Sequence, residues 1–535
     1  MAVKVVETPV LVVGAGPVGL ALACELGWRG IGCAVVESGC GAVTFPAGEA
    51  IFVRTMEHLR RWGIAGRIAQ SPFPADYPRN VVFVTRILGR EVARFERPSN
   101  AQALSRAGEL SPEAHIWCPK MYFDPLLAQF AVSQPSVLLH YRTSMLDFCQ
   151  DANAVTVRAQ GPNGEELQFR SQYLVACDGG RSATRRKLGI EFEGTFAEGH
   201  NFSIFFRAKE LLERQPHGLA SQYLTLASRH RSSLAAVDGY ELWRLSLYVD
   251  PAEVDAIDPM ACLHDAFGAS VQAEILKAQA WAGHRVVARS YREGRVFLAG
   301  DAAHMLWPKG GFGANTGIGD AVDIGWKLAA TLEGWGGPGL LDSYEAERRP
   351  IAARNVREAA SNRAADGMLP TGLELEEDTP RGEAARAAAG QQIRETRWKE
   401  WNTVGVQLGY RYAGSPIVAP DGTPEPPDLP TEYKPTTWPG ARAPHAWLRP
   451  NTSTLDTFGA GFVLAHDSRR DVAPMVAAAS DMGVPFRELR LPASIHGLYE
   501  RSLVLVRPDG HVAWRGNEVP ADPKSILARA TGHLT

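Results

Sequence analysis

The N-terminal segment carries the feature that most limits how this chain can fold. Pro9–Val13 is a short apolar run that predicts a buried strand, and Gly14-Ala15-Gly16-Pro17-Val18-Gly19 follows it directly. The apolar stretch Leu20–Trp28 predicts a helix, Cys33–Val36 predicts a second strand, and Glu37 comes at its end. This order is typical of a parallel βαβ unit that binds a dinucleotide: a strand, a glycine turn, a helix, a second strand and an acidic residue.

Each residue type in this motif has a physical reason for its position. Gly14 is expected to make a tight turn, Gly16 to let a pyrophosphate approach the backbone, and Gly19 to let helix and strand pack closely. The N–H groups at the start of the helix would face the phosphates. Glu37 lies 18 residues beyond Gly19, near the spacing of an acidic residue that binds an adenosine ribose hydroxyl.

A second glycine-rich stretch occupies residues 294–327. Val296–Ala299 predicts a short strand that leads to Gly300-Asp301, and a helix is expected to begin near Ile318. A carboxylate just beyond a strand lies where open α/β sheets bind ligands, and Pro308 with its neighbouring glycines would let the backbone approach a flat ligand. An ordinary strand–loop–helix connection is the plainer interpretation. A carboxylate for a sugar hydroxyl and a positive helix end for an electron-accepting ring nevertheless fit a flavin.

A third acidic residue follows a strand between these two stretches. Tyr173–Ala176 predicts a strand that leads to Cys177-Asp178-Gly179, with Arg181 and Ser182 behind it. Serine is a frequent N-cap, so a helix start capped by Ser182 is the plainer interpretation here.

Four apolar segments predict an antiparallel sheet distinct from the opening βαβ unit. They are Phe202–Arg207, Gln222–Ala227, Leu234–Val237 and Leu242–Val249. Met260–Lys277, farther along, is expected to be helical. Tyr223 and Trp243 lie on two of these strands and are candidate pocket residues for an aromatic ligand, although such residues more often belong to a sheet core.

Composition excludes several classes of function. A chain of 535 residues suggests about two to four domains, and a net charge of −3 provides no basic field for nucleic acid or anionic lipid. No apolar run reaches the roughly 18 residues of a spanning helix, and the N-terminus has no signal-peptide pattern, so a cytoplasmic protein without a membrane partner is expected. The seven scattered cysteines contain no C-x-x-C and predict neither a disulfide framework nor a metal site.

Taken together, the three motifs resemble a known family, the single-component FAD-dependent aromatic hydroxylases with the p-hydroxybenzoate hydroxylase fold. The resemblance covers nearly the whole chain. It is carried by the glycine motif with Glu37, by Asp178-Gly179 with Arg181 and Ser182, and by Gly300-Asp301-Ala302-Ala303-His304 with Pro308 and Gly310–Thr316. Gln407-Leu408-Gly409-Tyr410, Ser415-Pro416-Ile417-Val418 and the tail around Arg507–Arg515 resemble the phenol and polyketide hydroxylase branch.

This resemblance implies an α/β fold in three parts. A Rossmann-like FAD-binding domain is expected at 1–75, 105–185 and 285–400, with an inserted antiparallel-sheet substrate domain at 76–104 and 186–284. A proline-rich linker at 401–445 would lead to a thioredoxin-like domain at 446–535. No cysteine follows Cys262, so that domain could not perform dithiol exchange. A monomer or a homodimer is expected.

The resemblance also implies roles for individual residues. Asp301 would bind a ribityl hydroxyl of FAD, and Asp178 would lie near the pyrophosphate and the path of NAD(P)H. Pro308 would lie beside the flavin carbon that carries a peroxide, and backbone N–H groups around Gly313-Ala314-Asn315 would stabilise negative charge on the reduced ring. The expected cofactor-binding residues are therefore Gly14, Gly16, Pro17, Val18, Gly19, Glu37, Lys120, Asp178, Gly300, Asp301, Pro308, Gly313, Ala314 and Asn315.

Two positions depart from the family pattern. Many relatives have an arginine that touches FAD in the segment after the acidic ribose ligand, whereas Ser38–Ala50 contains none. Lys120 stands where many relatives have a glutamine that faces the cofactor.

The function predicted from these features is hydroxylation of a phenolic or other aromatic substrate. NAD(P)H would reduce FAD after the substrate binds, O2 would form a flavin hydroperoxide, and the distal oxygen would attack an electron-rich ring carbon. Pro308, Tyr223 and Trp243 are the candidate residues at the reaction site, while His304 is interpreted as structural. Two alternatives are an oxidase or halogenase on the same scaffold and, in another class, a non-catalytic flavin-binding protein.

Overall fold

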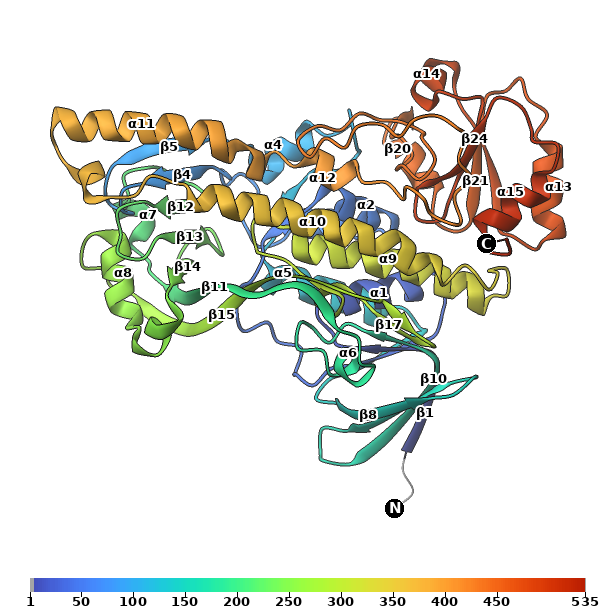
Figure 1. Ribbon diagram of the computed structural model, residues 1–535, viewed down its shortest axis with the longest axis horizontal. Helices are drawn as coiled ribbons and strands as arrows, with labels where there is room; N and C mark the ends of the chain where they lie inside the picture. Colours follow the sequence, from blue (N-terminus) through green and yellow to red (C-terminus); the bar gives the residue numbers. More distant parts are fainter. Residues whose placement is uncertain (1–3, 535) are drawn as a thin grey trace.

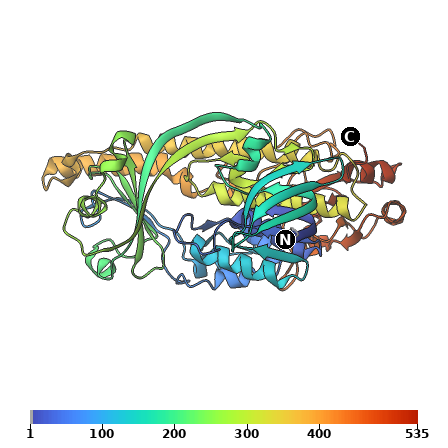
Figure 2. The same cartoon turned by 90° about the horizontal axis from the view of Figure 1, so that it is seen from below.

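Three main sheets organise the described residues, 4–534, of the computed structural model (Figure 1). The first lies in the centre of the molecule, the second forms one end, and the third belongs to a C-terminal unit at the other end (Figure 2). This arrangement confirms the predicted α/β fold class. None of the helices in the described part of the chain is both long enough and apolar enough to cross a membrane.

The first sheet is mainly parallel and begins with the N-terminal strand. β17, β10, β1, β2 and β7 run parallel in this order, and β16 is an antiparallel edge. The strands are β1 (Lys4–Val13), β2 (Cys33–Val36), β7 (Val137–His140), β8 (Ser144–Gln150), β9 (Val155–Gln160), β10 (Glu166–Ala176), β16 (Arg292–Glu293) and β17 (Val296–Leu298). The register pairs Val13 with Ala176 and Ala176 with Leu298, so the loops after three strands leave the sheet at one edge.

Helices from distant parts of the chain cover this sheet. α1 (Pro17–Trp28) packs against both α9 (Phe312–Leu332) and α5 (Lys120–Ser133), and α10 (Ser343–Gly367) lies beside α9. The shorter helices of this unit are α2 (Val53–Arg61), α3 (Ala65–Ala69), α4 (Asn100–Ser105) and α6 (Ala183–Lys187), and β3 (Ala50–Ile51) pairs with β6 (Ile116–Trp117). Ser182 caps α6 by accepting the Arg185 N–H at 2.9 Å, as its plainer interpretation predicts.

The second sheet has the order β18-β15-β11-β14-β13-β12-β4-β5 and is antiparallel except where β12 meets β4. Its strands are β4 (Val81–Val84), β5 (Glu91–Phe95), β11 (Phe192–Arg207), β12 (Gln222–Thr225), β13 (Ser232–Ala236), β14 (Leu242–Val249), β15 (Glu274–Ala288) and β18 (His304–Met305). The long strands β11 and β15 arch from this sheet toward the central unit (Figure 2). α7 (Leu211–Arg214) and α8 (Pro259–Phe267) also belong to this unit.

Two predicted helix boundaries are wrong. The helix expected across Met260–Lys277 ends at Phe267, because Gly268 takes a left-handed conformation that caps it, and β15 starts at Glu274. The helix expected near Ile318 starts six residues earlier, at Phe312. The glycines of that segment lie inside α9 because they bring it close to its neighbours: a Cβ on Gly317 would lie 3.0 Å from the Gly300 Cα.

The segment after α10 leaves the first unit. η3 (Leu373–Glu376) leads to α11 (Pro380–Arg397), which packs on β5 and shares an apolar cluster with β4 and β12. The expected boundary placed these residues with the FAD-binding domain, whereas in the structure they cover the second sheet. α12 (Val404–Leu408) and a stretch with little regular structure then lead to the C-terminal unit.

The C-terminal unit is a four-stranded thioredoxin-like sheet with the order β22-β21-β23-β24. Its elements are β19 (Trp447–Arg449), β20 (Thr452–Ser453), β21 (Phe462–His466), α13 (Ala473–Asp481), β22 (Phe486–Arg490), α14 (His496–Tyr499), β23 (Leu503–Val506), β24 (Val512–Gly516) and α15 (Pro523–Ala530). Trp326 of α9 shares one buried apolar cluster with Phe462 and Leu505 of this sheet. The unit is therefore docked on α9.

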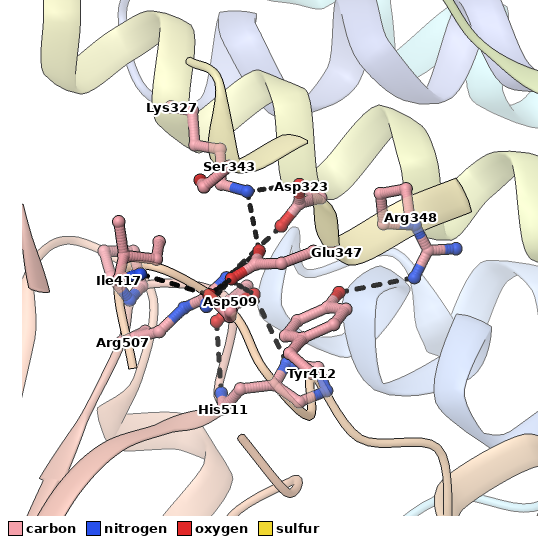
Figure 3. Close-up of polar contacts among 12 residues, drawn as sticks. Asp323, Lys327, Ser343, Glu347, Arg348, Tyr412, Ile417, Arg507, Asp509 and His511 are labelled. Carbon is pink, nitrogen blue, oxygen red and sulfur yellow. Dashed lines mark hydrogen bonds and ion pairs between the residues drawn. The ribbon is translucent and has the colours of Figure 1, made fainter. Parts of the chain in front are cut away.

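A buried cluster of charges joins α9, α10 and the C-terminal unit (Figure 3). Lys327 Nζ lies 2.7 Å from Asp323 Oδ2 and 2.6 Å from Glu347 Oε2. Arg507 approaches Glu347 Oε1 at 2.5 Å and Asp509 Oδ2 at 2.7 Å. All five side chains are nearly inaccessible to solvent. Each charge is therefore stabilised by the opposite charges around it, because water cannot solvate it.

We predict that Glu347→Gln strongly destabilises the protein, because it leaves Lys327 and Arg507 buried with reduced counter-charge. The expected loss is about 3–5 kcal/mol in the free energy of unfolding measured by urea denaturation. Glu425→Gln is the matched control. Its partner Arg411 forms a pair with a half-exposed carboxylate, and the expected change is about 0–1 kcal/mol. Equal small losses in both variants would show that the cluster adds no stability.

Candidate active site

A cavity of about 550 Å³ lies between the first two units. This volume is in the range of small-molecule and cofactor sites, roughly 300–1,000 Å³. The first unit contributes loop residues to its wall, including Asp301 and Pro308, and the second contributes strand residues such as Gln222 and Arg244. The cavity therefore brings together the parts of the chain expected to hold a cofactor and a substrate.

The N-terminal glycine motif has the geometry expected of a phosphate-binding turn. A Cβ on Gly14 would lie 2.4 Å from the Cys177 carbonyl oxygen, and a Cβ on Gly19 would lie 1.9 Å from the Gly14 carbonyl oxygen. Both glycines are thus required for packing. A Cβ on Gly16 would meet no atom within 4 Å, so open space adjoins the backbone where a pyrophosphate is expected.

Glu37 is held against this turn. Its Oε2 accepts the Ala15 N–H at 2.9 Å, and its Oε1 accepts the Gly39 N–H at 2.6 Å. These contacts fix the carboxylate beside the glycine motif, at the end of β2.

Asp178 has one satisfied oxygen and one without a protein partner. Thr184 donates to Oδ2 from its backbone N–H at 3.1 Å and from its hydroxyl at 3.0 Å. Oδ1 is buried and has no hydrogen-bond partner among the described residues. A buried polar atom in this state fits a site that a polar ligand completes.

Asp301 faces the cavity at the end of β17. The residue is exposed, and it lines the cavity wall. Burial raises the pKa of its carboxyl, and His304 and Lys120 only partly oppose this effect. The preceding Gly300 is close to α1, because a Cβ there would lie 2.8 Å from the Val18 side chain. Val18 therefore packs the motif, whereas Pro17 lines the cavity.

The start of α9 points at the same cavity. Gly311 is its N-cap, in a left-handed conformation, and Gly311, Gly313 and Ala314 line the wall. The first four N–H groups of a helix have no intrahelical partner, so those of Gly311–Ala314 are available to a ligand.

Asn315 acts through its side chain. Its Oδ1 accepts the Phe52 N–H at 2.9 Å and the Thr55 hydroxyl at 2.7 Å, while its Nδ2 donates to the carbonyls of Ala50 at 2.9 Å and Gly311 at 2.8 Å. It ties the start of α9 to the segment before α2. In an α-helix the Asn315 backbone N–H donates to the Gly311 carbonyl and is not free for a ligand. Of the three residues predicted to stabilise negative charge through their backbone N–H groups, Gly313 and Ala314 therefore remain.

Two further predicted residues lie in the cavity wall. Lys120, at the start of α5, forms an ion pair with Asp124 and contributes positive potential at Asp301. Pro308 is exposed to the cavity between β18 and α9. The adjacent Lys309 lies 3.2 Å from Asp366.

Tyr223 and Trp243 require a correction, because they do not line the cavity. Both are completely buried in the apolar cluster on the other face of the second sheet, and the Tyr223 hydroxyl donates to the Gly218 carbonyl at 2.6 Å. Successive side chains on a strand point to opposite faces of the sheet. A pocket residue predicted one position too early or too late therefore lies on the face away from the cavity.

The cavity face of the second sheet is the polar one, and sequence reasoning missed it. On β14 the apolar residues Trp243, Leu245 and Leu247 alternate with polar ones. The residues of the strands that line the cavity include Asn201, Ser203, Gln222, Ser233, Arg244, Ser246, Tyr248 and Gln279. This alternation was the available signal, since it distinguishes a core face from a ligand face.

His304 is structural, as predicted. It is completely buried, and its Nε2 lies 2.7 Å from Asp320 Oδ2 on α9.

Comparison with known proteins extends the resemblance. Residues 7–359 match the family model "FAD binding domain", and residues 436–534 match "Aromatic-ring hydroxylase, C-terminal". The 4-methyl-5-nitrocatechol 5-monooxygenase of Burkholderia sp is 32% identical, with 98% of this chain and 97% of that protein covered. The aklavinone 12-hydroxylase RdmE of Streptomyces purpurascens is also 32% identical, with 97% of each covered.

Solved structures agree with the relatives. The structure of chromopyrrolic acid-soaked RebC with bound 7-carboxy-K252c is 40% identical, has a TM-score of 0.93, and covers 99% of this chain and 100% of that one. A ternary complex of aklavinone-11 hydroxylase with FAD and aklavinone is 29% identical and has a TM-score of 0.83. The match covers 99% of this chain and 100% of that one. The chain therefore belongs to the FAD-dependent aromatic monooxygenases.

Proposed function

We propose that this protein uses NAD(P)H and O2 to hydroxylate an aromatic substrate bound between the first two units. When bound and reduced, FAD supplies the activation of O2 for transfer of one oxygen atom to the ring. The observation that carries the proposal is the composition of one cavity wall. Asp301, Pro308 and the N–H groups that begin α9 share it with the polar face of the second sheet.

The first unit provides a path for FAD. The open space beside Gly16 suits the pyrophosphate, and Glu37 at the end of β2 suits the adenosine ribose. The unpartnered Oδ1 of Asp178 would accept a hydrogen bond near the pyrophosphate, and Asp301 would accept one from the ribityl chain. The N–H groups of Gly313 and Ala314 would then face the ring and favour negative charge on it.

The second unit provides walls for a flat substrate. Trp281, Trp401 and Tyr248 line the cavity, and aromatic side chains present large apolar faces to an aromatic ring. Tyr248 brings a hydroxyl to this wall. Burial raises the pKa of that hydroxyl, Lys309 opposes the shift and Asp366 adds to it, so the group is held protonated beside the Asp366 carboxylate.

Relatives support the reaction type. Two of them carry the names of ring monooxygenases or hydroxylases, acting on a nitrocatechol and on aklavinone. The RebC structure has 7-carboxy-K252c bound in a related fold. A polycyclic aromatic substrate is therefore the first class to test, followed by simpler phenols.

We predict substrate-stimulated NAD(P)H oxidation with incorporation of oxygen into the product. FAD-loaded protein would be screened with phenols, hydroxybenzoates and polycyclic aromatic compounds, under 18O2. The expected product gains one 18O atom. An oxidase would instead release hydrogen peroxide and leave the product unlabelled, and a non-catalytic flavin-binding protein would show no stimulation by any compound.

We predict that Asp301→Ala weakens FAD binding by about 10- to 100-fold, because hydrogen bonds to a charged group contribute roughly 1.5–3 kcal/mol. FAD occupancy after purification, measured by absorbance, should fall sharply. Asp342→Ala is the control, since Asp342 is mostly exposed and Arg292 is its only ion-pair partner within the described part of the chain. Near-stoichiometric FAD in Asp301→Ala protein with native circular dichroism would contradict the assignment.

We predict that Pro308→Gly leaves FAD occupancy unchanged but lowers the yield of hydroxylated product per NAD(P)H consumed. Proline restricts the backbone next to the reaction site, and added freedom should let water and solvent protons compete with the substrate. The exposed Pro338→Gly serves as the control. A higher yield from the Pro308 variant would show that Pro308 is not at the reaction site.

A further inference from the structure

Arg97 is a charged side chain in the cavity wall for which the protein supplies no direct counter-charge. It follows β5, and its backbone N–H is held by Asn80 Oδ1 at 2.9 Å. Arg97 is one of the residues that line the cavity, and its side chain is half-buried. Within residues 4–534 this guanidinium forms no ion pair and no side-chain hydrogen bond.

The other cations of the wall are paired. Lys120 is bound to Asp124, Arg244 lies 2.6 Å from Glu49, and Lys309 lies 3.2 Å from Asp366. Glu400 is the acidic residue that most affects Arg97, but Arg397 engages its carboxylate. Arg97 thus differs from every other lysine and arginine of this wall.

A second arginine behind Arg97 adds to the positive charge. Arg79 is buried, and its guanidinium donates only to the backbone carbonyls of Pro98 and His115, each at 2.6 Å. Burial lowers the pKa of Arg97 to about 10, and burial together with the Arg97 charge lowers the pKa of Arg79 to about 9. Both remain charged at neutral pH. Burial and these two arginines hold the pKa of His115 well below its usual value, so the imidazole is neutral.

A partly buried guanidinium without a carboxylate is unfavourable, and such groups occur where a ligand completes the pairing. The planar guanidinium matches a carboxylate in a bidentate arrangement. We propose that Arg97, supported by Arg79, binds a carboxylate of the substrate, so that the preferred substrate is an aromatic acid. This proposal rests on the proposed function, because it assigns one end of the same cavity to the substrate.

The test compares matched ligands that differ by one carboxyl group. The pairs are 4-hydroxybenzoate with phenol, 3-hydroxy-2-naphthoate with 2-naphthol, and 7-carboxy-K252c with K252c. Their dissociation constants would be measured on FAD-loaded protein from changes in flavin absorbance. The wild type should bind the acid of at least one pair 10-fold or more tightly than its neutral partner.

Arg97→Gln should weaken binding of that acid by about 10- to 100-fold and change binding of the neutral compound less than twofold. Arg97→Lys should retain part of the preference, because it keeps the charge but not the fork geometry. Arg106→Gln is the matched control. Arg106 lies in the same segment, at the end of α4, but is exposed and outside the cavity wall, so its loss should leave the preference intact.

A second measurement requires no ligand. Removal of an unpaired, partly buried charge should leave the melting temperature of Arg97→Gln unchanged or raise it, because no folded-state partner is lost. A fall of more than about 3 °C would assign Arg97 a role in folding and overturn the proposal. Failure of every acid to bind, or equal binding of acid and neutral compound in every pair, would also overturn it.

The outcome separates this proposal from the proposed function. Acid binding that depends on Arg97, without stimulated NAD(P)H oxidation or 18O incorporation, would support the carboxylate site and reject the hydroxylase. Hydroxylation of neutral phenols without any preference for acids would support the hydroxylase and reject the carboxylate site.

Discussion

Asp320 is the buried carboxylate on which the cofactor loop depends, the connection 299–311 between β17 and α9 that carries Asp301 and Pro308. It accepts the Gly300 N–H at 3.1 Å, lies 2.7 Å from His304 Nε2, and accepts from Arg348 Nε at 2.8 Å. Burial alone would raise its pKa, but His304 and Arg348 outweigh burial and hold the pKa below its usual value. Since Gly300 directly precedes Asp301, the interaction that fixes α9 to α10 also positions the residue that faces the cavity.

The same helix pair extends this support to the C-terminal unit. Arg348 donates to the Tyr412 hydroxyl at 3.3 Å, and the Arg507 guanidinium lies 4.9 Å from the centre of the Tyr412 ring. Glu347, adjacent to Arg348 on α10, pairs with Arg507 (Figure 3). Two consecutive residues of one helix therefore connect the cofactor loop to a domain that has no cysteine. The thioredoxin-like unit is thus tied by these contacts to the helices behind the cavity, and dithiol exchange is unavailable to it.

Local steric rules determine which features the sequence predicts. The motif around Gly14 and the carboxylates at 178 and 301 are recognisable because each requirement involves residues close in the chain, and the strand register then brings them together. The faces of the second sheet are not local: Trp243 and Arg244 differ by one position, and only packing decides which points to the cavity. The pairing of Asp320 with Arg348 depends on contacts between distant segments, and so does the absence of a partner at Arg97. No sequence motif marks either feature.

One indole sets the position of the second sheet relative to the cofactor loop. Trp307 directly precedes Pro308 and packs into a notch between β11 and β15, where a Cβ on Gly199 or Gly283 would lie 2.9 or 2.4 Å from its ring. Its Nε1 donates to Glu198 at 2.8 Å, which fixes its orientation. Because β18 also pairs with β15, the strands that line the cavity are linked to the backbone that leads to Pro308. Under the proposed function, a substrate bound to the second sheet would therefore have a defined position relative to Pro308, as transfer of a single oxygen atom to one ring carbon requires.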